Sequence, residues 1–237
     1  MEQFRSPVLL SRLAIAGLGI MAICHVLFVF SGIGQIISPA RSFDLGDGDK
    51  MTVWLMAQVF ISLVLLPGYI FTIVTFLMWL FRVFKNLPSL RSDQMEFTPG
   101  WAVGWWFIPF ANLVKPFQAV RTAWAESDPE VELEHGFLTS VGSGAPGFIS
   151  AWWALWIVSN IVSNITNRLE GAALAGEEVI VGYLTVVSSA LWVIAAGFAI
   201  KVVLNITERQ EQRSLVTDAM AVNVSPPPPP TFDTVND

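Results

Sequence analysis

The sequence predicts an all-α integral membrane protein with four transmembrane helices, and three observations lead to this fold class. Hydrophobic residues make up 54% of the 237 residues and charged residues only 14%, whereas soluble domains carry roughly 25% charged residues. Four apolar runs are each long enough to cross the ~30 Å hydrocarbon core as a helix. The basic residues are concentrated in the segments that this topology places on one side of the membrane.

The four predicted spans cover about residues 13–37, 52–81, 148–167 and 179–204. Each is expected to be helical, because backbone groups in lipid need partners within their own segment. Pro67-Gly68 interrupts the second run. The first run is too long for a secretory signal, whose apolar region spans roughly 7–15 residues, so we expect an uncleaved anchor. Residues 1–12 are then a cytoplasmic N-terminus, and residues 13–213 form the membrane domain.

The distribution of basic residues favours four spans over five. With four spans and both termini cytoplasmic, basic residues divide 10 inside to 3 outside, as the positive-inside rule requires. A fifth span over residues 100–114 would change the split to 6 inside and 7 outside. The ten residues are Arg5, Arg12, Arg82, Lys85, Arg91, Lys115, Arg121, Lys201, Arg209 and Arg213.

An interfacial region at residues 99–127 is predicted between the second and third spans, and it begins with a tryptophan-rich segment at residues 99–114. Residues 100–114 would extend only about 22 Å as a helix, and the prolines at 99, 109 and 116 disfavour a continuous helix. Tryptophan side chains favour the headgroup boundary, so an interfacial position is the first expectation. A re-entrant segment shielded by other helices stays open as the alternative.

An amphipathic helix is predicted directly after this segment, with Pro116 in its first turn. Its apolar stripe consists of Leu113, Phe117, Val120 and Trp124. The stripe suits either the membrane surface or the protein's own spans, and the two are compatible. The acidic run at residues 126–135 is interpreted as a solvated loop. Residues 214–237 are predicted to form a disordered tail, whose five consecutive prolines favour polyproline II.

Catalytic and metal-binding signatures are absent from the sequence. We therefore predict no catalytic residues, no metal and no cofactor, and the net charge of −6 argues against nucleic acid. His25 is the ionisable group within a predicted span, which makes it a functional candidate or a neutral imidazole bonded to a neighbouring helix. Asn160 and Asn164 give the third span a polar face, suited to interhelical hydrogen bonds or to a polar cavity.

The sequence contains the segments "FLMWLFRVFKNLPSL", "FTPGWAVGWWFIPFANLVKPFQAVRTAWAES" and "AWWALWIVSN". Together they resemble a bacterial membrane family known as domain of unknown function 4328, and the resemblance covers roughly residues 52–206. It implies a bacterial multi-pass protein of the cytoplasmic (inner) membrane, and it implies no activity. Members often carry proline-rich N-terminal extensions, whereas the prolines here are C-terminal.

The leading functional hypothesis is a non-enzymatic membrane protein that docks lipid or protein at its cytoplasmic face. Expected partners are anionic lipids of the bilayer, a protein partner or a second copy of the chain. The alternative is a small oligomeric transporter or channel component with a polar site on the third span. The candidate interface residues are Arg82, Lys85, Asn86, Trp101, Trp105, Trp106, Pro109, Asn112, Lys115, Pro116 and Arg121; those of the intramembrane face are His25, Asn160 and Asn164.

Overall fold

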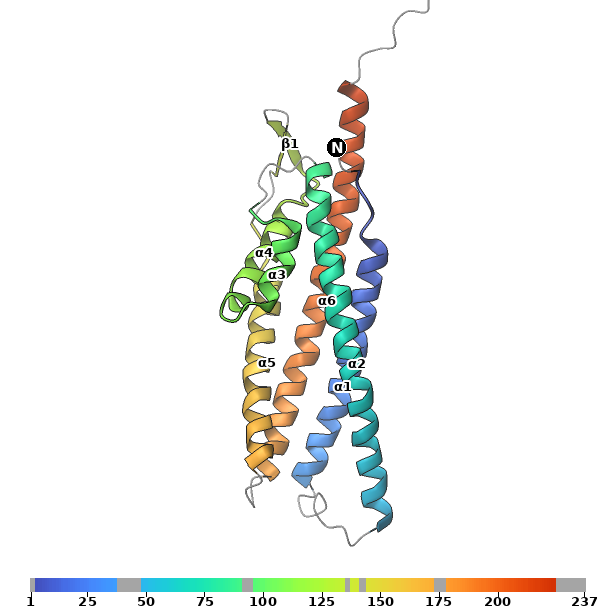
Figure 1. The fold of residues 1–237 in the computed structure, drawn as a ribbon, viewed down its shortest axis with the longest axis vertical. Coiled ribbons are helices and arrows are strands. Elements are labelled where there is room, and N and C mark those ends of the chain that lie inside the picture. Colours follow the sequence, from blue (N-terminus) through green and yellow to red (C-terminus); the bar gives the residue numbers. More distant parts are fainter. Residues whose placement is uncertain are drawn as a thin grey trace, which may run out of the picture.

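Four long helices lying roughly along one axis form the body of the protein (Figure 1). The computed structural model describes residues 3–37, 48–90, 96–134, 137–140, 144–172 and 178–224. The long helices are α1 (Val8–Ile37), α2 (Gly48–Asn86), α5 (Gly147–Ala172) and α6 (Glu178–Val224). The N-terminus and the end of α6 lie at the same end of the molecule, the upper end in Figure 1.

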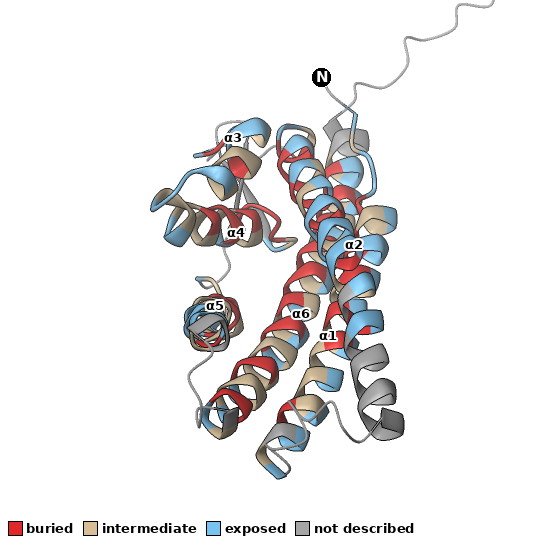
Figure 2. Cartoon of the chain, turned by 60° about the horizontal axis from the view of Figure 1, so that its bottom comes forward, coloured by how far each residue is buried: buried red, intermediate tan, exposed pale blue. Residues whose placement is uncertain are grey.

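The helices pack in the order α2, α1, α6, α5, with α1 and α6 in the most extensive contact. Two glycines of α1 permit this packing. A Cβ on Gly17 would lie 2.8 Å from Thr72 Oγ1 of α2, and one on Gly32 would lie 2.9 Å from the Gly182 carbonyl oxygen of α6. Such close helix approach through small residues is common in membrane bundles. The outer helices α2 and α5 do not pack along their lengths, and Figure 2 shows them apart.

The buried core lies at the end of the bundle that holds the N-terminus. It brings together Trp79, Leu80 and Phe84 of α2, Ile149 of α5 and Ile206 of α6. Further from this end, large apolar side chains such as Phe30, Phe60 and Leu63 are about two-thirds exposed or more. The described part of the chain contains four helices long and apolar enough to cross a membrane, and lipid would cover these exposed side chains. The prediction of four such helices is confirmed.

Short elements connect α2 to α5 at the same end. A 3₁₀ turn, η2 (Leu87–Leu90), ends α2, and α3 (Pro99–Gly104), η3 (Trp105–Phe107), η4 (Ala111–Leu113) and α4 (Lys115–Ala125) follow. In Figure 2, α4 runs across the view while α5 is seen nearly end-on. A two-stranded antiparallel ribbon, β1 (Val131–Glu134) and β2 (Phe137–Ser140), precedes α5. The ribbon is an addition to the predicted all-α fold.

All four long helices extend beyond their predicted spans, and α6 extends furthest. Helix α2 continues through Pro67, and the Thr72 hydroxyl donates a hydrogen bond to the Gly68 carbonyl oxygen one turn away. Helix α6 continues past 204 to Val224, so residues 214–224 are helical, not a disordered tail. Buried Ser214 and Thr217 lie within this extension, which shows why polar composition alone gave the wrong boundary. Residues 225–237, with the five prolines, lie outside the described residues.

Candidate functional site

The tryptophan-rich segment is a short helix followed by an irregular turn. Thr98 caps α3, because its hydroxyl oxygen accepts a hydrogen bond from the Trp101 amide at 3.4 Å. After η3 the chain reverses at Phe110, whose φ is 63°, and the Ala111 amide donates to the Pro109 carbonyl oxygen at 2.8 Å. This is a γ-turn with positive φ, a rare and strained conformation. The Phe110 side chain is 87% exposed.

Exposed and half-buried aromatic and basic side chains lie close together in and around this segment. The rings of Trp101 and Trp105 lie 4.8 Å apart. The Lys115 ammonium lies 5.6 Å from the Phe97 ring centroid and 5.9 Å from that of Trp105, within the range of cation–π attraction. Near the middle of α4, the exposed Arg121 guanidinium lies 5.6 Å from the Phe117 ring. We call Trp101, Trp105, Phe110, Lys115 and Arg121 the aromatic-basic face.

The inward side of the same segment packs on α2 and α5. The Trp106 ring makes edge-on contacts with Phe76 of α2, at 5.5 Å, and with Trp153 of α5, at 5.8 Å. The Trp153 indole N–H also donates to the Leu113 carbonyl oxygen at 3.0 Å. Because these contacts reach Trp156 as well, the segment extends beside the third turn of α5. The segment thus closes the gap between α2 and α5 at this end.

An open cavity of about 350 Å³ lies beneath the tryptophan-rich segment. All four long helices and this segment contribute side chains to its wall, which is mostly apolar and contains no Lys, Arg, Asp or Glu. Three lining residues, His25, Trp106 and Asn112, each carry one buried polar atom without a hydrogen-bond partner among the described residues. The atoms are His25 Nδ1, Trp106 Nε1 and Asn112 Oδ1.

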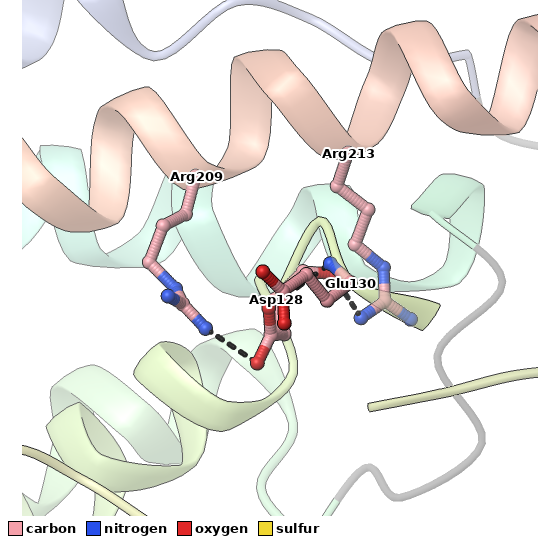
Figure 3. A network of polar contacts seen from close by, with 4 residues as sticks. All are labelled: Asp128, Glu130, Arg209 and Arg213. Atoms are coloured by element: carbon pink, nitrogen blue, oxygen red, sulfur yellow. Dashed lines mark hydrogen bonds and ion pairs between the residues drawn. The ribbon is translucent and has the colours of Figure 1, made fainter. Parts of the chain in front are cut away.

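A buried polar junction connects α6 to the chain after α4 (Figure 3). Asp128 forms an ion pair with Arg209 of α6, in which Asp128 Oδ2 and Arg209 Nη2 lie 2.8 Å apart. Arg213 is fully buried and donates to the Leu90 carbonyl oxygen at 3.2 Å and to the Asp128 carbonyl oxygen at 3.0 Å. The Arg209 guanidinium lies 4.2 Å from the Trp124 ring centroid. The junction therefore fixes α4 against α6.

A second part of the junction holds the N-terminal stretch. The Asn86 amide donates to Gln210 Oε1 at 3.0 Å and to the Arg5 carbonyl oxygen at 2.9 Å. Gln210 is fully buried and donates to the Val83 carbonyl oxygen and the Ser127 hydroxyl. Four segments distant in sequence therefore share one hydrogen-bond network.

The structure divides the predicted interface residues among several places. Trp101, Trp105, Lys115 and Arg121 belong to the aromatic-basic face, Trp106 and Asn112 line the cavity, and Asn86 is buried in the junction. Pro109 is exposed at the strained turn, and Pro116 is buried in the first turn of α4. Arg82 is half-buried and Lys85 exposed at the end of α2.

The predicted intramembrane set is not brought together. His25 stacks on Trp192 of α6 at 5.2 Å and lines the cavity. The Asn160 and Asn164 amides donate to carbonyl oxygens one turn back in α5, those of Trp156 and Asn160. Neither asparagine lines the cavity, so neither shares a site with His25.

Sequence reasoning missed the junction and misread the start of the acidic run. Glu126, Ser127 and Asp128 are buried, so the solvated-loop interpretation is wrong for these three residues. A signal was present in α6, where buried Gln210, Arg213 and Thr217 recur at helical spacing. Within the described residues, no group of His, Cys, Asp and Glu is arranged to hold a metal ion.

Fold and composition together define a multi-pass membrane protein with a buried polar junction at one end of the bundle. The sequence profile of the family described as domain of unknown function (DUF4328) matches residues 46–208. The chain belongs to this family, as the tryptophan-rich motifs indicate. No curated protein and no solved structure matches the chain.

Proposed function

We propose that the protein is a non-enzymatic docking protein of the bacterial cytoplasmic membrane, which engages anionic lipid headgroups through the aromatic-basic face. The observation that carries the proposal is the exposed, strained turn at Phe110, five residues before Lys115 in the sequence. Strained backbone of this kind costs about 1–3 kcal/mol and tends to mark functional positions. Insertion of the exposed Phe110 ring between lipids would offset this conformational cost.

The chemistry of the face matches the membrane boundary. Indole rings favour the headgroup level, and each basic residue near an anionic surface contributes about 1 kcal/mol. Phe107 and Leu113 flank the turn and are at least half exposed, so the apolar tip is larger than one ring. Irregular backbone is excluded from the hydrocarbon core unless protein covers it, so we place the tip at the headgroup boundary.

The proposed orientation has both termini in the cytoplasm. The N-terminus and the end of α6 share one end of the molecule, and Lys115, Arg121 and Arg213 come from elements at that end. Arg168 lies near the end of α5, at the opposite end of the bundle. Excess positive charge on one side favours the cytoplasmic position of that side.

Depth-dependent quenching tests the insertion of the tip. Phe110→Cys and Glu130→Cys would be labelled with an environment-sensitive fluorophore in a Cys24→Ala background and reconstituted with lipids that carry nitroxide quenchers at shallow or deep positions. We expect the label at 110 to be quenched most by the shallow nitroxide and the label at exposed Glu130 to be quenched little. Equal, weak quenching at both positions would refute insertion.

Anionic-lipid dependence tests the charge component separately. In nanodiscs, phosphatidylglycerol should stabilise the wild-type protein relative to phosphatidylcholine, and Lys115→Gln with Arg121→Gln should remove about 2 kcal/mol of that difference. Lys115→Arg with Arg121→Lys keeps both positive charges, is the matched control and should leave the difference unchanged. A lipid preference that survives the double substitution would contradict headgroup docking by this face.

A further inference from the structure

We propose that the cavity beneath the tryptophan-rich segment binds a narrow, uncharged lipid-phase molecule with a hydroxyl group at one end. This site is separate from the aromatic-basic face, and its proposal does not depend on headgroup docking. It rests on the position of the cavity, on its chemistry and on the unpaired polar atoms in its wall.

The cavity is elongated along the helices. Its lining runs from Leu18 to His25 on α1 and from Trp192 to Ala199 on α6, which corresponds to about 10 Å in each helix. Trp106 and Asn112 line it from the tryptophan-rich segment, whereas His25 stacks on Trp192 further from that segment. A ligand in it would therefore lie parallel to the helices, as an acyl or isoprenoid chain does in a bilayer.

We place the mouth of the cavity beside α2 and the tryptophan-rich segment, where its lining residues are exposed. Ala199 and Met21 are buried in its deep wall, whereas Tyr69, Ile73 and Phe107 line it and are each more than a third exposed. The outer helices do not pack along their lengths, and residues at this level of the bundle would face lipid. A ligand could then diffuse in sideways from the bilayer.

The volume favours a small molecule over a helix as the occupant. About 350 Å³ falls at the lower end of the roughly 300–1,000 Å³ found for small-molecule sites. A helix with side chains is about 10–12 Å across, and several of its turns would exceed this space. The cavity therefore suits one slender ligand better than a segment of a second chain.

The polar atoms define the head group. The Trp106 indole N–H can only donate and the Asn112 carbonyl oxygen can only accept, and a hydroxyl group carries both the acceptor and the donor that these atoms need. A buried polar atom without a partner costs about 1–3 kcal/mol, and such a ligand would relieve that cost. Because the cavity is lined by no charged side chain, an uncharged head group fits and a carboxylate or ammonium does not.

Photolabelling of the reconstituted protein with decanol carrying a diazirine tests the proposal. We expect peptide mapping to place the label on the deep-wall segments of α1 and α6, with competition by unlabelled decanol but not by decane. Ala22→Phe fills the cavity from α1 and should lower labelling about tenfold, the equivalent of roughly 1.4 kcal/mol. Ala16→Phe, at an exposed position of the same helix, should leave it unchanged.

Trp106→Phe keeps an aromatic ring and removes the donor. In this variant unlabelled decanol should compete less well with the photolabel. An unchanged thermal unfolding temperature would show that the variant remains folded. Equal labelling of the Ala22→Phe and Ala16→Phe variants, or equal competition by decane and decanol, would overturn the site. If no labelling is found and native mass spectrometry shows a dimer, a second copy of the chain covers the mouth of the cavity. This result would also overturn the proposed ligand site.

Discussion

The buried guanidinium of Arg213 is the most informative position at which to perturb the polar junction. Replacement by methionine keeps a long side chain but removes every donor. The carbonyl oxygens of Leu90 and Asp128 would then each lose a hydrogen bond, of 3.2 and 3.0 Å respectively. Leu90 also ends η2, where a cation is favourable beside unpaired helix carbonyls.

The size of the effect follows from these contacts. Each buried acceptor left without a partner costs about 1–3 kcal/mol, and breaking a buried charged network costs about 3–5 kcal/mol. At roughly 2–4 °C per kcal/mol for a chain of this length, we expect Arg213→Met to lower the unfolding temperature by about 6–20 °C. The unfolding temperature of Arg213→Lys should lie between those of the wild type and Arg213→Met, because an ammonium group keeps the charge but lacks the planar set of donors of a guanidinium.

The assay is thermal unfolding in mild detergent, followed by intrinsic tryptophan fluorescence. Arg168→Met is the control, since Arg168 is exposed on α5 and surface changes are usually within about 0.5 kcal/mol. An unfolding temperature of Arg213→Met equal to that of the control would refute the reasoning. It would mean that the cost of burying the charge cancels the hydrogen bonds, as happens for some buried ion pairs.

The other predictions concern helix packing and the polar face of α5. Gly32→Ala should destabilise the protein by about 1–3 kcal/mol, because the new Cβ would meet the α6 backbone at 2.9 Å. Gly34→Ala is the control and should leave stability unchanged, because the space around Gly34 is open. Equal unfolding temperatures of the two variants would contradict the α1–α6 packing. Asn160→Leu and Asn164→Leu should each change stability by less than about 1 kcal/mol, because both amides bond only within α5. Loss of ion or solute flux in reconstituted Asn160→Leu would instead favour the transporter hypothesis.

Sequence patterns predicted the helices well because lipid imposes a simple rule. A backbone in hydrocarbon must be helical over the whole apolar length, so runs such as 148–167 identify their helices directly. The same rule explains why Pro67 did not end α2, because leaving the helix within hydrocarbon would deprive more backbone groups of partners.

The polar parts were harder to predict, because polar residues outside the membrane are compatible with either solvent or burial. Asp128 and Arg213 are 85 positions apart in sequence, and nothing local indicates their pairing. Asn86 was predicted to lie at the interface, whereas its side chain bonds to Gln210 and Arg5 within the junction. Trp106 lines the cavity and Trp105 does not, and adjacent residues of the same type carry no signal for that difference.

The position of the tryptophan-rich segment on the side of the termini is tested most directly by cysteine accessibility in intact cells. In a Cys24→Ala background, Glu130→Cys follows that segment and Asn167→Cys lies near the other end of α5. A membrane-impermeant maleimide should label position 167 in intact cells and position 130 only after permeabilisation. Labelling of position 130 from outside, in intact cells, would contradict the topology and the docking face together.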